Sequence, residues 1–335
     1  MLFTGIGCAV AFGAAESNAD YPRKRKDVII RDPCIVVHDG KYYMYGTGVT
    51  GNGYGCYISE NLEDWSDPVA VFEKPADYDG ICDFWAPECH EYNGKFYLFA
   101  TYRSALSGKR GVAIYEAEKP DGPFVQLGDG HITPKHRDCI DGTLFVDDGG
   151  QPWMVYVNEW TSNPDEVGEM AAAKLSDDLS RFISEPIVLF RADETVWASG
   201  KITDGPYLHH TEDGRLIMLW SNGTKKGYAV GIAYSENGKI DGKWKHQPSA
   251  LYKADNYHTE GGHGMLFTTA EGELLMSVHS PNYSDASVHE TAVFLPVKDI
   301  GCTVVLDDAV SGAQKTAYFF ERLFLKAYYF FADLI

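Results

Sequence analysis

Basic residues are scarce in this sequence, which has 29 lysines and arginines against 48 aspartates and glutamates and a formal net charge of −19. A charge of this sign and size repels phosphate backbones and anionic lipid surfaces. We therefore expect no nucleic acid partner and no membrane partner. A neutral oligosaccharide would be little affected by such a field.

Paired cysteines are also missing. The seven cysteines are scattered along the chain and none forms a C-x-x-C pair, so neither a zinc site nor redox chemistry is indicated. We expect these thiols to be reduced. Cys34, Cys89 and Cys139 lie in or beside apolar runs, where a free thiol behaves as a small buried hydrophobic group.

Long apolar runs are absent, since none approaches the roughly 20 residues that cross a bilayer. Residues 1–19 are apolar and end in Ser17-Asn18-Ala19, which imitates a signal peptidase site. However, no lysine or arginine precedes this stretch, and a secretory signal needs positive charge there. A cytoplasmic location is therefore expected, with secretion as the alternative.

Segments of helical period are scarce as well, which excludes a doubly wound α/β fold. Instead, one hairpin pattern occurs five times: a short apolar strand, a turn ending in glycine, and a strand rich in aromatic and β-branched residues. The hairpins are expected at residues 32–45, 86–99, 141–156, 204–220 and 262–276. Asn-Gly and Asp-Gly between apolar runs favour hairpins because the tight turn needs positive φ.

The spacing of these hairpins indicates the architecture. Successive turn glycines, at 40, 94, 149, 214 and 272, are separated by 54, 55, 65 and 58 residues, enough for one four-stranded sheet and its loops. Sheets repeated in this way are typical of β-propellers. We predict an all-β, five-bladed β-propeller as a single catalytic domain over residues 28–307.

Two segments flank the predicted propeller. Residues 1–27 form a lead-in whose basic cluster at 23–26 is expected to be solvated. Residues 308–335 form an aromatic, apolar tail with helix-compatible spacing. This tail is expected to be a helix packed on the propeller, with an oligomer contact or an atypical terminus as alternatives. The sequence does not indicate an oligomeric state.

The first strand of each propeller blade lines the central channel, so residues at the heads of the five hairpins should converge. These heads are Asp32, Glu88 after Pro87, Asp141, Asp204 and His263. Three aspartates at the same repeat position would repel one another unless chemistry or a cation uses them. Hydrolysis of a glycosidic bond uses two carboxylates, one protonated and one ionised, and a third keeps the acid's pKa high. No organic cofactor is needed for this chemistry.

Other residues near the heads suit a sugar. Aromatic faces match the apolar faces of sugars, and the candidates are Phe84, Trp85, Trp160 and Trp197, of which Trp85 lies nearest a hairpin head. Glu88 is expected to orient an arginine or a sugar hydroxyl. His263, between two glycines at the axis, is expected to contact an ion or the substrate.

The hairpin heads resemble glycoside hydrolase family 43, and the likeness extends over roughly residues 28–307. The motifs that carry it are Arg31-Asp32-Pro33, Trp85-Ala86-Pro87-Glu88, Ile140-Asp141-Gly142, Asp204-Gly205-Pro206-Tyr207 and Gly262-His263-Gly264. The resemblance implies an inverting α-L-arabinofuranosidase, β-xylosidase or arabinanase. It also implies that Asp32 is the general base, that Asp141 tunes and orients the acid, and that His263 helps to hold a calcium or sodium ion on the axis, largely through water.

The sequence departs from the family pattern in the fourth blade, where Asp204-Gly205-Pro206 replaces the usual Glu-Gly-Pro. Asp204 is favoured as the general acid, and Glu159, just after a blade-three strand, is the alternative. The leading hypothesis is an inverting, exo-acting glycosidase that removes terminal arabinofuranosyl or xylosyl residues from plant polysaccharide fragments. The alternatives are a catalytically silent sugar-binding propeller and a related five-bladed enzyme acting on fructosides or mannosides.

Overall fold

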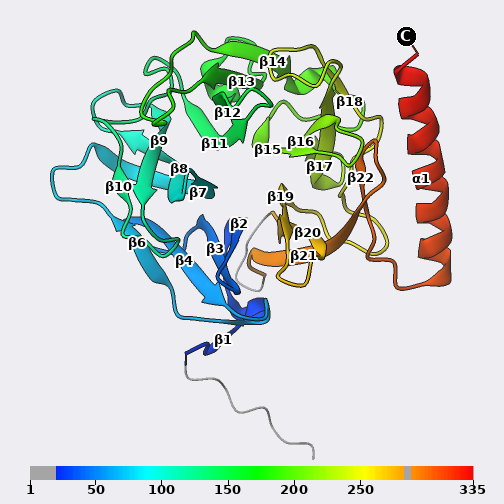
Figure 1. The fold of residues 1–335 in the computed structure, drawn as a ribbon, viewed down its shortest axis with the longest axis horizontal. Helices are drawn as coiled ribbons and strands as arrows, with labels where there is room; N and C mark the ends of the chain where they lie inside the picture. The colour runs from blue at the N-terminus through cyan, green and yellow to red at the C-terminus, as the bar shows by residue number, and fades with distance from the viewer. Residues whose placement is uncertain (1–19, 283–287, 335) are drawn as a thin grey trace, which may run out of the picture.

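The computed structural model describes residues 20–282 and 288–334, so Cys8 and the signal-like Ser17-Asn18-Ala19 lie outside the described residues. Within them, five antiparallel sheets follow one another around a central axis (Figure 1). The predicted five-bladed β-propeller is confirmed. No helix in the described part of the chain is long and apolar enough to span a bilayer, and the six cysteines found there are all free thiols.

Each blade uses strands that are consecutive in the sequence. The first contains β1 (Arg23–Lys24), β2 (Arg31–His38), β3 (Lys41–Thr47), β4 (Gly53–Ser59), β5 (Asp64–Trp65) and β6 (Val69–Glu73). The second contains β7 (Gly80–Tyr92), β8 (Lys95–Ser104), β9 (Arg110–Ala117) and β10 (Val125–Gln126). The third contains β11 (Cys139–Val146), β12 (Pro152–Asn158), β13 (Glu169–Lys174) and β14 (Ile187–Arg191).

The last two blades follow the same plan. The fourth contains β15 (Asp204–His210), β16 (Leu216–Thr224), β17 (Gly227–Ser235) and β18 (Trp244–His246). The fifth contains β19 (Gly262–Thr268), β20 (Leu274–Ser280), β21 (Thr291–Asp299) and β22 (Val304–Leu306). The helical elements are η1 (Arg25–Asp27), η2 (Trp160–Ser162), η3 (Ala192–Glu194) and α1 (Gly312–Ala332).

The inner two strands of every blade form the predicted hairpins. Asp39-Gly40 and Asn93-Gly94 have positive φ at both residues, as a two-residue hairpin turn requires. In the third blade the positive φ falls on Gly150 and not on Gly149, because Asp147 and the residues after it make a longer turn. The turn chemistry therefore predicts the hairpins well.

Apolar side chains fill the space between neighbouring blades and form one cluster at each of the five blade interfaces. The cluster between the fifth and first blades joins Met44 to Leu275 and closes the ring. The main chain supports this closure, because Ile30 N donates to Glu290 O at 3.0 Å. The basic cluster of the lead-in pairs with the first blade, where Arg23 meets Asp67 at 2.8 Å on the surface.

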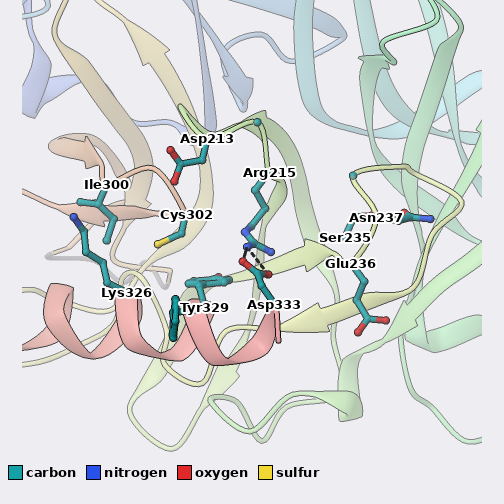
Figure 2. A pocket seen from close by; sticks show the side chains of 13 residues that line it. Asp213, Arg215, Ser235, Glu236, Asn237, Ile300, Cys302, Lys326, Tyr329 and Asp333 are labelled. Carbon is teal, nitrogen blue, oxygen red and sulfur yellow. Dashed lines mark hydrogen bonds and ion pairs between the residues drawn. The ribbon is translucent and has the colours of Figure 1, made fainter. Parts of the chain in front are cut away.

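Helix α1 lies outside the ring beside the fourth and fifth blades (Figure 1). Its first turn is capped by Ser311, whose Oγ accepts from Gln314 N at 3.1 Å. Near its end, Arg215 donates to both carboxylate oxygens of Asp333, at 2.8 and 2.7 Å. Figure 2 shows this pair in the hollow between α1 and the fourth blade, where the Arg215 guanidinium also lies 4.8 Å from the Tyr329 ring centroid.

Candidate active site

Every inner hairpin is interrupted by a β-bulge near the axis. The strand register shifts there across two residues, which are Asp32-Pro33, Ala86-Pro87, Asp141-Gly142, Gly205-Pro206 and His263-Gly264. The first residue of each pair has a left-handed φ between 41° and 54°. For a residue other than glycine this conformation costs about 1–3 kcal/mol, and such strain is typical of functional sites. The bulges direct Asp32, Asp141 and His263 toward one another.

Asp204 does not occupy the bulge position, which corrects the prediction of three aspartates at one repeat position. The equivalent residue in the fourth blade is Gly205, and Asp204 precedes it. The reason is steric, because a Cβ on Gly205 would lie 2.7 Å from Cγ of His263. In every blade the bulge residue is followed by a proline or a glycine. This following residue is the sequence signal by which the five hairpins can be aligned correctly. By the same alignment Glu88 lies two residues beyond the bulge residue Ala86.

Hydrogen bonds from the five bulge residues link each blade to the preceding one, all the way around the axis. The N–H of each bulge residue donates to a side chain of the preceding blade, and the acceptors for residues 32, 86, 141, 205 and 263 are His279 Nδ1 (3.1 Å), Thr47 Oγ1 (2.7 Å), Thr101 Oγ1 (3.1 Å), Asp141 Oδ2 (3.0 Å) and Ser221 Oγ (2.8 Å). Four of these acceptors lie on the second strand of their blade. In the third blade the corresponding residue is Val157, which has no side-chain acceptor, and Asp141 takes that place.

Asp32 is held in the ionised form. Its Oδ1 lies 3.2 Å from Nδ1 of His263, and its Oδ2 accepts from Thr47 Oγ1 at 2.6 Å. Burial by itself would raise the pKa of Asp32, but the adjacent His263 outweighs burial and holds that pKa well below its usual value. At neutral pH Asp32 can therefore accept a proton.

Asp141 and His263 form the second pair of the cluster, with 3.8 Å between Asp141 Oδ2 and His263 Nδ1. Burial, assisted by the charges of Asp204 and Asp32 and opposed by His263, raises the pKa of Asp141 to about 7. Burial would lower the pKa of His263, but Asp32 and Asp141 raise it to about 10. His263 is therefore an imidazolium at neutral pH, surrounded by carboxylates.

Asp204 is a second carboxyl that burial favours in the protonated form. Its Oδ2 accepts from the Tyr228 hydroxyl at 2.8 Å. Burial, together with the charges of Asp32 and Glu159, raises the pKa of Asp204, although the Tyr228 hydrogen bond acts in the opposite direction. Asp141 and Asp204 are thus the two carboxyls of the cluster that favour holding a proton, while Asp32 remains charged.

Sequence reasoning missed several residues that position this cluster. Tyr228 lies on β17, the third strand of its blade, and no local motif marks it. His279 is fully buried, accepts from Asp32 N and, through Nε2, donates to Asn282 Oδ1 at 2.8 Å. The ring of Tyr228 stacks on that of His279 with 5.8 Å between centroids, so the surroundings of Asp32 and Asp204 are in contact.

Glu88 borders a small hollow on the axis beside the bulges, which Asp32 and His263 also line. It accepts from the Thr143 hydroxyl, and its Oε1 lies 2.8 Å from Nε2 of His90. These partners are a threonine and a histidine and not the predicted arginine, and the alternative that Glu88 orients a sugar hydroxyl stays a prediction. Because β7 carries Glu88 two residues past the bulge, its polar partners are His90 on the same strand and Thr143 on the neighbouring inner strand.

Glu159 belongs to a charged cluster between the second and third blades. Its Oε2 accepts from Arg110 Nη1 at 2.7 Å, and Arg110 Nε donates to Asp83 at 2.8 Å. The Arg110 guanidinium also lies 4.4 Å from the centroid of the Trp85 ring and covers one face of it. These contacts hold the Glu159 carboxylate in an ion pair with Arg110.

The other predicted aromatic contacts separate into two groups. Phe84 packs against Tyr54 at 5.5 Å between ring centroids, within a core cluster. Trp197 packs edge-on against Trp220 at 4.9 Å, within another. Their stacking with sugar is therefore not supported. Trp160, the first residue of η2 and the neighbour of Glu159, is 38% exposed.

Comparison with known families decides which group of proteins this arrangement represents. The family model for glycosyl hydrolases family 43 matches residues 27–297. The chain belongs to family 43. The resemblance predicted from the five hairpin heads is confirmed, and the family acts on oligosaccharide or polysaccharide substrates.

Similar proteins support this assignment. The crystal structure of the endo-arabinase from Bacteroides thetaiotaomicron VPI-5482 has a TM-score of 0.76 and 34% identity, and the likeness covers 83% of this chain and 97% of that one. The extracellular exo-α-(1→5)-L-arabinofuranosidase ArbA of Cellvibrio japonicus is 28% identical over 47% of this chain and 46% of its own length. The extracellular endo-α-(1→5)-L-arabinanase 1 of Bacillus subtilis is 22% identical over 40% and 44%. The family 43 chain thus spans less than half the length of these two curated relatives.

The predicted calcium or sodium ion finds no direct ligand set here. Among residues 20–282 and 288–334 no group of three or more histidine, cysteine, aspartate or glutamate side chains is placed to hold a metal. Nδ1 of His263 is occupied by its ion pair with Asp32. An ion held through water on this family 43 axis stays a prediction, which metal analysis before and after chelation would test.

Proposed function

We propose that this family 43 chain is an inverting glycosidase that cleaves α-L-arabinofuranosyl linkages of arabinan fragments. The observation that carries the proposal is the difference in protonation within one buried cluster, where Asp32 is ionised while Asp141 and Asp204 favour a proton. Paired carboxyl groups whose surroundings separate their pKa values are suited to acid and base roles. The names of the relatives given above support an arabinan substrate.

Each residue has a role that follows from its contacts. Asp32 takes a proton from the water that attacks the anomeric carbon, and His263 and Thr47 hold its two oxygens in place. As the carbon–water bond forms, the glycosidic bond breaks and Asp204 gives its proton to the leaving oxygen. Asp141 accepts from Gly205 N and so fixes the main chain beside Asp204. The proton released to Asp32 balances the one lost from Asp204.

Hydrolysis of linear arabinan, followed by proton NMR of the new anomeric centre, tests this function. Inversion at an α-linkage gives the β-anomer first, before mutarotation mixes the two forms. We expect the β-anomer and a higher rate on arabinan than on xylan. Early α-anomer would contradict inversion, and sugar binding without turnover would favour the catalytically silent propeller.

The mode of attack is tested with the same reaction. Relatives with exo and endo names both match this chain, and we retain exo attack on terminal arabinofuranosyl or xylosyl residues as the specific proposal. Release of monomeric arabinose from the first minutes of reaction is the expected product pattern. A ladder of longer oligosaccharides at that stage would instead assign endo attack.

Replacing Tyr228 with phenylalanine is expected to lower kcat about tenfold with little change in KM. The variant removes the 2.8 Å hydrogen bond to Asp204 but keeps the ring that stacks on His279, and a hydrogen bond between uncharged groups contributes about 0.5–1.5 kcal/mol. Tyr234→Phe is the matched control, because it removes a hydroxyl that contacts Tyr328 far from Asp204. Equal kcat values for the two variants would show that Tyr228 does not position the acid.

An extracellular location is part of this proposal. The two curated relatives described above are named as extracellular proteins, which favours export over the cytoplasmic location expected from the sequence. Fractionation of the producing cells, with activity followed in medium and lysate, tests this point.

A further inference from the structure

Helix α1 has two unlike faces. Toward the propeller it places Leu325 and Tyr329, which are buried, and the Tyr329 hydroxyl donates to Gln247 Oε1 at 3.2 Å. Tyr318 bonds Asp308 at 2.7 Å near the start of the helix. Away from the propeller the helix places large apolar side chains that are 55–64% exposed, namely Phe319, Phe320, Leu323, Phe324, Phe330 and Phe331, and Leu334, two residues past the end of the helix, is 68% exposed.

These seven residues and Ala327 form one continuous surface, here called the apolar stripe. At about 100° per residue those within α1 all fall within a band of about 140° around the helix, and Leu334 continues the band just past its end. From Phe319 to Leu334 no charged residue falls within this band. The apolar stripe is therefore a single face, with the anchoring residues on the other side of the helix.

The size of the apolar stripe indicates a macromolecular partner. Taking roughly 200 Å² for a phenylalanine side chain, the five phenylalanines alone expose about 600 Å². The largest apolar patch on a typical monomer is about 300–600 Å², whereas a standard protein interface buries about 800 Å² on each side. With its two leucines the stripe reaches the range of a protein interface.

Charge argues against a lipid surface as the partner. Helices that lie in a bilayer interface carry many lysines and arginines on their polar face. Here that face contacts the propeller, where Arg322 is paired with Asp307, and the chain has a net charge of −19. An anionic membrane would repel this protein.

The apolar stripe is self-complementary. An antiparallel pairing centred on Leu325 would place Phe319 opposite Phe331, Phe320 opposite Phe330, and Leu323 opposite Ala327. A twofold interface requires this reciprocity, in which each residue meets its counterpart twice. The larger leucine opposite the smaller alanine at the centre also allows the two helices to approach closely.

We infer that helix α1 is a dimerisation element and that the apolar stripes of two copies of this chain pack antiparallel across a twofold axis. Sedimentation equilibrium of the full chain tests this inference. We expect about twice the monomer mass of 37.2 kDa at micromolar concentration. Leu323→Glu should raise the dissociation constant at least 100-fold, since the charge is buried twice. Ile183→Glu, at a site 52% exposed on the third blade, is the matched control and should remain dimeric.

Crosslinking tests the antiparallel register. Phe320 and Phe330 are about 15 Å apart along one helix, too far for a disulfide within a chain. In a background without the exposed Cys82, a mixture of Phe320→Cys and Phe330→Cys chains should form mixed disulfides, and neither variant alone should do so. A monomeric wild type, a dimeric Leu323→Glu variant with native circular dichroism, or binding of monomers to neutral phosphatidylcholine vesicles through the stripe would overturn the inference.

Discussion

Asp32→Asn is expected to lower kcat on arabinan by about 10²–10⁴-fold, which is the usual contribution of a positioned general base. The amide has the shape of the carboxylate and can still accept from Thr47, but it cannot take a proton from water. Because substrate contacts are retained, KM should change much less than kcat. Steady-state kinetics on arabino-oligosaccharides measures both quantities.

The control for Asp32→Asn is a similar change at a carboxylate outside the cluster. The Asp138 side chain is 8% exposed, against 11% for Asp32, and bonds Lys109 and Ser162 near the charged cluster between the second and third blades. Asp138→Asn should keep most of the activity, and melting temperatures of both variants establish that they are folded. An Asp32→Asn enzyme within a few-fold of wild type would rule out Asp32 as the base.

Asp204→Asn should lose activity in a way that depends on the leaving group. On arabino-oligosaccharides, whose leaving alcohol needs a proton, we expect a loss of about 10²–10⁴-fold. On 4-nitrophenyl α-L-arabinofuranoside the loss should be less than tenfold, because nitrophenolate leaves without protonation. Comparison of kcat on the two substrates therefore isolates the proton donor.

Two further variants complete the assignment of the acid. Asp204→Glu keeps a carboxyl group beside Tyr228 and should retain far more activity than Asp204→Asn. Glu159→Gln breaks the ion pair with Arg110, but any loss of kcat in this variant should be the same for both leaving groups. If the loss of kcat depends on the leaving group in Glu159→Gln and not in Asp204→Asn, the general acid is Glu159.

The propeller could be predicted because its signals are local. Asp39-Gly40 and Asn93-Gly94 specify hairpins through backbone conformation alone, and their recurrence gives the number of blades. The position of Asp204 is harder to predict. Aligning the five hairpin heads by their acidic residues makes Asp204 the equivalent of Asp32 and Asp141. The bulge residue is Gly205, and its lack of a side chain is required by His263 of another blade. That requirement arises from a tertiary contact between blades.

Other parts of the site have no local signature at all. Tyr228 and His279 act on Asp204 and Asp32 from strands that are distant in the sequence. Likewise, the spacing of the C-terminal residues indicates a helix, but both of its faces are aromatic. Which face packs on the propeller is decided by Arg215 and Gln247, about a hundred residues earlier.

The closure of the ring has a consequence for catalysis. Asp32 comes from the first blade, whereas His263 and His279, which pair with its carboxylate and main chain, come from the fifth. The joint between the beginning and the end of the propeller therefore runs through the general base. Any loosening that separates these two blades removes the cation that keeps the base charged. Catalysis should therefore fail as soon as the ring opens, even while the rest of the fold is intact.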